Sequence, residues 1–376
     1  SFSGEEVSFL PRGESLRLLW VPRGVVVALT PWNFPAATVT RKIAPALLGG
    51  NTMVLKASSA TPLTALLIAR ALTRAGLPPG VLNVIQGPSA DLGPALLGHP
   101  ACSTVTLTGS TATGVEVIRL SAPRVAKCLL ELGGKAPVLI HRDADLDWAA
   151  RATLWARFWN SGQACIAAER VLVDERVAAA FVRKLTSLTR QLRVGPGLAA
   201  GTDLGPMYAL SARDAVARSV DAGRADGVRV VVGGTVPTRG PLARGAFYPP
   251  TILTEVPDDS PLIEEEIFGP VLPIQTYRTV EEAVERANES KYGLSSYVFT
   301  RDLALAERLQ HELRYGETYV NRVGPESPQG YHAGFRLSGL GGEGTRFGVE
   351  DYLQRKSVYV EWKEPHTADY FFPYPR

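Results

Sequence analysis

The segment FWNSGQACIAAER, residues 158–170, places Cys165 between the small or uncharged triplets GQA and IAA. Most lone cysteines are small apolar residues packed in a core. Small neighbours also leave room for a substrate to reach the sulfur, which a cysteine nucleophile requires. The segment alone leaves both interpretations open, so other parts of the chain have to decide between them.

A second segment, LTGSTATG, holds Gly109 and Gly114 between a strand-like run and a helical pattern. The free backbone amides at such a helix start can face a phosphate group. The segment lacks the Lys-Ser/Thr pair of a phosphate-binding loop, and no GxGxxG follows the first strand-like run. A tight turn that binds nothing explains the pattern equally well.

The elements that would position these residues are strands and helices in alternation. Five apolar runs, separated by helical patterns, occupy residues 24–30, 51–57, 81–87, 103–109 and 126–134. Near-continuous apolar strands separated by helices are typical of a parallel sheet covered on both faces. Five such units predict a Rossmann-like nucleotide-binding domain over residues 23–134.

The alternation repeats over residues 135–354 and predicts a second α/β domain there. Residues 1–22 alternate like a hairpin, and residues 355–364 look like a lone exposed strand. Because such strands often pair with another subunit, we expect them to form a small oligomerisation unit in a homo-oligomer. The aromatic and proline-rich residues 365–376 are expected to form a docked tail.

Charge and composition exclude several classes of protein. The 376 residues carry 40 basic and 37 acidic side chains, and no Lys/Arg block indicates nucleic-acid binding. No apolar run reaches the roughly 18 to 20 residues that span a bilayer. The three cysteines form no CxxC pattern, which favours a reducing compartment such as the cytoplasm. The five histidines are scattered, so no metal site is predicted.

Six motifs decide between the two interpretations of the cysteine. They are TPWNFP (30–35), LKASSATP (55–62), LTGSTATG (107–114), ELGGKAP (131–137), FWNSGQACIA (158–167) and EEEIFGPVLP (264–273). In this order they resemble the aldehyde dehydrogenase superfamily, and the resemblance extends from Gly4 to Trp362. The C-terminal segments GETYVNR (316–322) and QGYHAGFRLSGLGGEG (329–344) are similar to those of lactaldehyde dehydrogenases, which also handle glycolaldehyde.

The resemblance implies an α/β aldehyde dehydrogenase-like fold and a role for three catalytic residues. Cys165 would add to an aldehyde carbonyl and give a thiohemiacetal, while Cys102 and Cys128 would only pack. The side-chain amide of Asn33 and the backbone N–H of Cys165 would stabilise its oxyanion, although an Asn33 that merely caps the next helix is an alternative. Glu131 matches the base that activates water to hydrolyse the thioester, which indicates a carboxylate product.

The resemblance also implies a bound NAD or NADP. The side chain three residues after Lys56 is often Glu in NAD-preferring relatives, and here it is Ser59, which permits the 2′-phosphate of NADP. Lys56 and Glu266 would bind the ribose groups, Phe268 would pack beside the nicotinamide, and Ser110 would contact the pyrophosphate. The full set of expected cofactor-binding residues is Trp32, Lys56, Ser59, Gly109, Ser110, Glu266 and Phe268.

Substrate recognition is expected from one face of a helix and from a C-terminal loop. Phe34, Thr38 and Arg41 are spaced i, i+4 and i+7, so they share a helix face after Asn33. The resemblance implies that Arg41 acts with Glu326 and His332 around a small hydroxyaldehyde, although chance surface placement of Arg41 is the alternative.

Four functions are compatible with these patterns. The leading hypothesis is NAD(P)-dependent oxidation of lactaldehyde or glycolaldehyde. A broad-specificity aldehyde dehydrogenase, a cofactor-free thiol hydrolase using Cys165 and Glu131, and a truncated inactive partner subunit are the alternatives. The last arises because relatives carry an N-terminal helical segment ahead of the hairpin, which this sequence lacks whether by nature or as a fragment.

Overall fold

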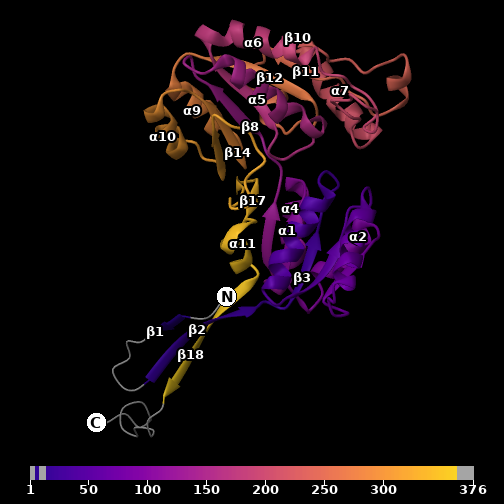
Figure 1. The fold of residues 1–376 in the computed structure, drawn as a ribbon, viewed down its shortest axis with the longest axis vertical. Coiled ribbons are helices and arrows are strands. Elements are labelled where there is room, and N and C mark those ends of the chain that lie inside the picture. The colour runs from indigo at the N-terminus through magenta and orange to yellow at the C-terminus, as the bar shows by residue number, and fades with distance from the viewer. Residues whose placement is uncertain (1–4, 8–13, 362–376) are drawn as a thin grey trace.

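The computed structural model describes residues 5–7 and 14–361. Figure 1 shows two α/β bodies stacked along the long axis and a narrow sheet that extends away from them. The expected tail at 365–376, the turn of the expected hairpin and the end of the 355–364 strand lie outside the described residues. In the part of the chain that is described, no helix is long and apolar enough to cross a membrane.

The first body contains a six-stranded sheet in the order β17-β7-β6-β3-β4-β5, in which only β17 is antiparallel to its neighbour. Its strands are β3 (Val25–Leu29), β4 (Thr52–Lys56), β5 (Leu82–Ile85), β6 (Cys102–Thr108), β7 (Lys127–Glu131) and β17 (Gly339–Leu340). Its helices are α1 (Pro35–Leu48), α2 (Pro62–Arg74), α3 (Ser89–Leu97) and α4 (Thr111–Ser121). The five parallel strands are those that the apolar runs predicted.

The short strand β17 has a consequence for the site. It belongs to the second predicted domain in sequence, yet Gly339 pairs with Glu131 at the end of β7. Gly339 has to be a glycine there, because a Cβ would lie 2.4 Å from the carbonyl oxygen of Leu130. This pairing brings the segment around residues 332–343 next to the carboxyl end of the first sheet.

The second body contains a seven-stranded sheet in the order β10-β11-β12-β9-β8-β14-β15, parallel except for β10. Its strands are β8 (Ala136–Ile140), β9 (Ala168–Asp174), β10 (Arg229–Val232), β11 (Thr251–Thr254), β12 (Val271–Tyr277), β14 (Ser295–Phe299) and β15 (Glu317–Val320). Its helices are α5 (Leu146–Phe158), α6 (Glu175–Thr189), α7 (Leu210–Ala225), α8 (Pro261–Glu264), α9 (Val280–Asn288) and α10 (Leu303–Glu312). Strand β11 and helix α7 were not predicted from the sequence.

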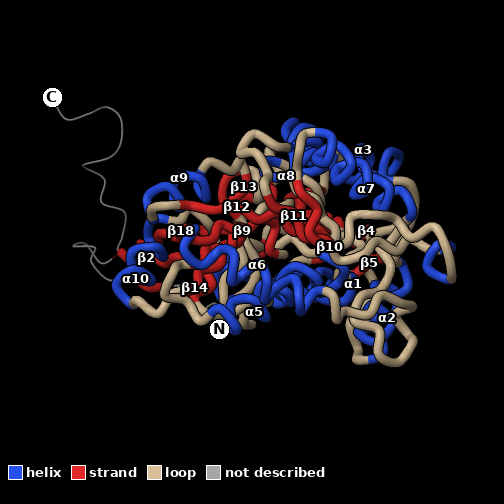
Figure 2. Tube along the Cα trace, turned by 90° about the horizontal axis from the view of Figure 1, so that it is seen from above, coloured by secondary structure: helices blue, strands red, loops and turns tan. Residues whose placement is uncertain are grey.

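Burial on both faces explains the composition of the central strands. All seven residues of β9 are buried, and successive residues pack on opposite sides of the sheet. Val171 and Val173 join the cluster formed with α5 and α6, whereas Leu172 joins the cluster formed with α9 and α10. Figure 2 shows these strands as a central layer with helices on both sides. A strand without an exposed face needs near-continuous apolar residues.

The narrow sheet consists of β1 (Glu5–Val7), β2 (Glu14–Pro22) and β18 (Leu353–Glu361), in the order β1-β2-β18. The lone strand expected near 355–364 therefore pairs with β2 of its own chain, in antiparallel register from Leu353 to Glu361. Helix α11 (Thr345–Glu350) leads into β18. The short strands β13 (Tyr292–Gly293) and β16 (Phe335–Arg336) form a separate antiparallel pair. Tyr359 on β18 is 71% exposed in the described part of the chain.

Candidate active site

One cavity of about 270 Å³ collects most of the chemically interesting side chains. Six residues singled out from the sequence line it: Asn33, Arg41, Glu131, Cys165, Glu326 and His332. They come from the start of α1, the end of β7, the loop after α5 and the segment that precedes β16. Phe34 and Thr38 line the same cavity, so the helix face that the spacing predicted does point into it.

A tight turn carries Cys165 into this cavity. After α5 the chain passes through left-handed backbone at Asn160, Ser161 and Gly162. A Cβ on Gly162 would lie 2.3 Å from the carbonyl oxygen of Gly269, so this position requires glycine. Cys165 is half-buried at the end of the turn, and its thiol belongs to the cavity lining. The motif NSGQAC therefore forms the turn that places Cys165 in the cavity wall.

The other two cysteines have different surroundings. Cys102 on β6 is buried within an apolar cluster, and Cys128 on β7 packs against the same cluster. Burial raises the pKa of both thiols, which keeps them protonated and unreactive. All three cysteines are free, and among them only Cys165 lines the cavity.

Asn33 lies directly before α1 and faces the turn that carries the cysteine. Its Nδ2 donates to the carbonyl oxygen of Gln163 at 3.2 Å, and Asn160 Nδ2 donates to the carbonyl oxygen of Asn33 at 3.2 Å. The helix begins at Pro35 with Phe34 at its N-cap, and no side chain caps it. Asn33 is thus not the helix cap, which removes the structural alternative considered for it.

Glu131 is the last residue of β7 and is 4% exposed. Neither of its carboxylate oxygens has a hydrogen-bond partner among the described residues. Burial raises the pKa of Glu131 to about 8, an effect that the nearby His332 opposes. A buried carboxyl without a hydrogen-bond partner, on the wall of a cavity, is suited to exchange a proton with a bound molecule.

His332 is held on both its backbone and its ring. Its backbone N–H and C=O pair with Glu343 at 2.8 and 2.7 Å. Its Nδ1 lies 3.0 Å from Glu317 Oε1, and its Nε2 lies 3.5 Å from Glu131 Oε2. Burial alone would lower the pKa of His332, but the charge of Glu131 and contacts with Cys165 and Glu317 raise it well above its usual value.

Two further ion pairs complete the polar wall. Arg41 on α1 pairs with Glu326, whose side chain is 9% exposed. The neighbouring Lys42 is fully buried and donates to Glu343 at 2.6 Å and to Thr106 Oγ1 at 3.1 Å. No metal site was predicted from the sequence. A carboxylate oxygen of Glu317, one of Glu326 and a ring nitrogen of His332 lie within 4.8 Å of one another, and Arg41 supplies a positive charge beside them.

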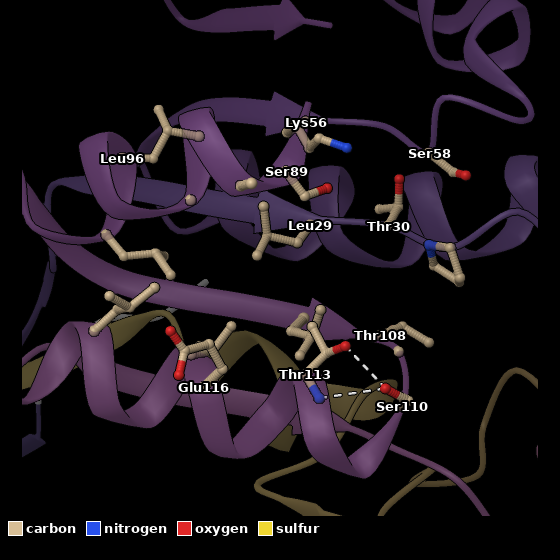
Figure 3. A pocket seen from close by; sticks show the side chains of 18 of the residues that line it. Leu29, Thr30, Lys56, Ser58, Ser89, Leu96, Thr108, Ser110, Thr113 and Glu116 are labelled. Carbon is tan, nitrogen blue, oxygen red and sulfur yellow. Dashed lines mark hydrogen bonds between the residues drawn. The ribbon is translucent and has the colours of Figure 1, made fainter. Parts of the chain in front are cut away.

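A second cavity of about 570 Å³ lies along the carboxyl edge of the first sheet. Trp32, Lys56, Gly109 and Ser110 line it, as the sequence predicted for a dinucleotide site. Ser110 caps α4, with its Oγ accepting from the backbone N–H of Thr113 at 3.3 Å. Figure 3 shows Lys56, Ser58 and Thr30 across this pocket from Ser110 and Thr113.

The lining of this cavity fits a dinucleotide. The helix that starts at Ser110 turns its free amides and its positive end toward the pocket, which suits a pyrophosphate. Lys56 makes no ion pair among the described residues, and burial lowers its pKa. Ser59 is exposed and does not line the cavity, whereas its neighbour Ser58 does.

The segment that contains Glu266 and Phe268 is fixed by a buried ion cluster around Glu169. Glu169 accepts from Arg157 at 2.6 Å and from Lys135 at 2.9 Å. It also accepts from the backbone N–H groups of Ile267 at 3.0 Å and Phe268 at 3.2 Å. This cluster holds Phe268 in left-handed backbone, with its ring edge-on to Trp32 at 5.8 Å.

Glu266 itself faces the glycine pair of the ELGG motif. Its Oε1 accepts from the backbone N–H of Gly134 at 2.8 Å, and burial raises its pKa to about 8. A Cβ on Gly133 would lie 2.5 Å from Glu266 Oε2, and a Cβ on Gly134 would lie 2.3 Å from the carbonyl oxygen of Cys165. The two glycines therefore bring Glu266 and the cysteine loop close together.

Comparison with known proteins agrees with this geometry. The model of the aldehyde dehydrogenase family matches residues 1–358. The chain belongs to the aldehyde dehydrogenase family. The predicted family and α/β fold class are thereby confirmed, and the chain is an NAD(P)-dependent aldehyde dehydrogenase.

Three relatives show how close the similarity is. The D-glyceraldehyde dehydrogenase (NADP(+)) of Picrophilus torridus is 46% identical over 93% of this chain and 70% of its own length. The lactaldehyde dehydrogenase of Escherichia coli is 38% identical over 96% of this chain and 74% of its own length. The structure of a 3,6-anhydro-L-galactose dehydrogenase in complex with NAP superimposes with a TM-score of 0.93 at 40% identity, covering 96% of this chain and 75% of that one.

Several residues of this aldehyde dehydrogenase site were not found from the sequence. Glu317 and Glu343 contact His332, Lys42 pairs with Glu343, and Glu169 supports the Glu266 segment. Glu317 and Lys135 do lie in the motifs GETYVNR and ELGGKAP, but a motif does not show which other residues its side chains contact in the fold. Buried charges can be found from sequence only when their partners are known, and these partners lie up to 301 positions apart in the chain.

Proposed function

We propose that this aldehyde dehydrogenase oxidises small 2-hydroxyaldehydes, such as lactaldehyde and glycolaldehyde, to their carboxylates. The observation that carries the proposal is the polar wall formed by Arg41, Glu326 and His332 in the same small cavity as Cys165. Buried polar groups discriminate strongly in favour of a ligand whose hydroxyl pairs with them. The relatives named for glyceraldehyde and lactaldehyde also act on aldehydes with a hydroxyl beside the carbonyl, which supports the same class.

The first step is the attack of the Cys165 thiolate on the aldehyde carbon. The new C–S bond turns the carbonyl oxygen into an oxyanion, which needs hydrogen-bond donors. Asn33 Nδ2 and the backbone N–H of Cys165 would donate to it; the contact of Asn33 Nδ2 with the carbonyl oxygen of Gln163 supports this role, because it holds the side chain beside the cysteine loop. The half-buried sulfur and the small cavity exclude bulky aldehydes.

The second step is an oxidation that requires the neighbouring cavity. When NAD(P)+ is bound, it supplies the acceptor for the hydride that leaves the substrate carbon. Lys56 and Glu266 would bind its ribose hydroxyls, the α4 amides beside Gly109 and Ser110 its pyrophosphate, and Phe268 and Trp32 would pack beside it.

The third step is hydrolysis of the thioester on Cys165. Glu131 would accept a proton from water, whose oxygen bonds to the acyl carbon as the C–S bond breaks. The unpartnered oxygens of Glu131, in the same cavity as Cys165, support this role. The products are a carboxylate and the regenerated thiolate. An acid at this position favours hydrolysis over transfer to a cofactor thiol.

The narrow sheet has a role in our proposal as well. Among the described residues β18 is an edge strand of this sheet, and Tyr359 on it is 71% exposed. A sheet edge with free backbone groups is a template for another chain. We propose that β18 contributes to a homo-oligomer, and that the enzyme works in a reducing compartment that keeps Cys165 free.

The substrate proposal is tested by comparing glycolaldehyde with acetaldehyde, which differs only by the hydroxyl. The parent should prefer glycolaldehyde by at least about tenfold in kcat/KM. Arg41→Met should remove most of this preference, and the exposed Arg308→Met on α10 should keep it as a matched control. Equal kcat/KM values for both aldehydes in the parent would favour the broad-specificity alternative instead.

A further inference from the structure

Glu317 is a buried acid at the active site to which the catalytic steps above assign no role. It is the first residue of β15, and its side chain is 8% exposed. Its Oε1 lies 3.0 Å from His332 Nδ1, and its Oε2 accepts from the hydroxyl of Tyr319 at 2.8 Å. Both oxygens are thus occupied, and one of them is directed at the ring of His332.

We propose that Glu317 is a positioning residue that fixes the orientation and hydrogen placement of His332. An ionised carboxylate only accepts hydrogen bonds, so Nδ1 of His332 must be the donor in this contact. The ring is then locked with Nε2 directed at the cavity, 3.5 Å from Glu131 Oε2. A histidine ring fixed in this way can present one defined nitrogen to a substrate hydroxyl.

The local backbone explains how the two residues meet. Gly316, directly before Glu317, lies so close to the loop after His332 that a Cβ there would be 1.6 Å from the carbonyl oxygen of Ala333. The loop itself is fixed by the two backbone hydrogen bonds between His332 and Glu343. The glycine therefore permits the close approach, and the strand then places Glu317 beside the ring.

The far side of Glu317 is equally well supported. The Tyr319 ring stacks on Tyr297 with centroids 5.1 Å apart, and the Tyr297 hydroxyl donates to the carbonyl oxygen of Ile166 at 2.6 Å. Ile166 directly follows Cys165 in the chain. A continuous set of contacts thus joins His332, Glu317, Tyr319 and the cysteine loop. This rigidity is what a positioning role requires.

The other charged groups around the ring set the direction of the expected change. Glu131 on β7 and Cys165 act on the ring directly, Arg41 on α1, Glu326 and Glu343 line the same cavity, and Lys42 on α1 binds Glu343. Burial opposes a charge on His332, whereas Glu131, Cys165 and Glu317 favour it. Removing the negative charge of Glu317 should therefore make the imidazolium of His332 less stable.

The first test is the titration of His332 in the full chain with ring-labelled histidine, followed by NMR. The His332→Asn variant identifies the signal among the five histidines. E317Q should lower the His332 midpoint by at least about one pH unit, because a neutral amide replaces an anionic acceptor. E312Q, on the exposed end of α10, should leave the midpoint in place. An unchanged midpoint in E317Q overturns the proposal.

The second test is kinetic and rests on the proposed substrate class. E317Q should lower kcat/KM for glycolaldehyde by about 10- to 100-fold and that for acetaldehyde by less than about threefold. Because kcat/KM contains only steps up to the first irreversible one, hydrolysis by Glu131 does not enter. Equal losses for both aldehydes would overturn the positioning role. A parent without preference for glycolaldehyde would overturn the substrate class alone, since the NMR midpoint needs no substrate.

A second variant keeps the proposal testable where E317Q does not fold. E317D retains the charge but withdraws the carboxylate by about one C–C bond, roughly 1.5 Å. We expect a smaller fall in the His332 midpoint and a partial loss of the glycolaldehyde preference. Parent-like values for both quantities in E317D would show that the contact does not position the ring.

Discussion

Nε2 of His332 lies 3.5 Å from Oε2 of Glu131, and the two side chains are 6% and 5% exposed. A histidine and a carboxylate so close in a buried site interact electrostatically, so each affects the titration of the other. Burial still raises the pKa of Glu131 to about 8. The proposed base is therefore mostly protonated at neutral pH and becomes active as the pH rises.

The first prediction is a rise of kcat with pH. Where hydrolysis of the thioester limits turnover, kcat should increase by about tenfold per pH unit well below pH 8 and level off above it, because only the ionised Glu131 accepts a proton from water. The measurement is a profile of kcat from about pH 6 to about pH 10. A profile that is flat across this window would show that Glu131 does not limit turnover.

The second prediction concerns the cysteines. Cys165→Ala should lower aldehyde oxidation by at least about a thousandfold, because no other described cysteine lines the cavity. Cys102→Ala is the matched control, since it removes a buried thiol from the core without touching the site. Initial rates of NAD(P)H formation with glycolaldehyde give the comparison. Cys165→Ala turnover within about tenfold of the parent would contradict the mechanism.

The third prediction concerns the choice between NAD and NADP. Ser59 is exposed next to the cavity, where a serine neither binds a ribose strongly nor repels a 2′-phosphate. The parent should bind both cofactors with Kd values within about a hundredfold of each other. Ser59→Glu should weaken the binding of NADP more than it strengthens the binding of NAD, because the negative charge of the glutamate repels the 2′-phosphate.

Isothermal titration of both cofactors decides this third prediction. Ser59→Gln is the control, because it has the size of Glu without the charge. If Ser59→Gln weakens the binding of NADP as much as Ser59→Glu does, the effect is steric. A parent that binds NAD a thousandfold or more tightly than NADP would show that another residue governs the 2′ position.

The fourth prediction contrasts two neighbouring glycines. Gly133→Ala should fold but weaken cofactor binding by about tenfold, because its Cβ displaces only the flexible end of Glu266 and its hydrogen bond to Gly134. Gly134→Ala should be strongly destabilising, because its Cβ meets the backbone carbonyl of Cys165. Thermal unfolding and cofactor titration separate the two effects. Equal melting temperatures for the two variants would contradict this account.

The parts of the fold that could be predicted are those with local patterns. The apolar runs at β3 and β6 follow from the burial of most of their residues, and Cys165 and Glu131, which the motifs predict to act together, line the same cavity. The short TILT strand was missed because four residues carry too little periodicity. That β18 pairs with β2 of its own chain could not be read from an exposed strand pattern.

The candidate site was predictable as a set of residues but not as a network. Spacing within one helix placed Phe34, Thr38 and Arg41 on one face, as the cavity shows. The contact between Glu317 and His332 depends on the close approach at Gly316, which joins a strand and a loop by tertiary structure alone. Such contacts are absent from any sequence period, because they arise only when two sheets and a loop pack together.

The central claim, that Cys165 carries the acyl group and Glu131 removes it, has one direct test. Glu131→Gln is mixed with glycolaldehyde and NADP+, quenched with acid, digested and measured by mass spectrometry. The account predicts NADPH formation of about one equivalent per site, then slow turnover, with the peptide of Cys165 heavier by one glycoloyl group. Reduced cofactor without an acyl group on Cys165, or an acyl group on another residue, would contradict it.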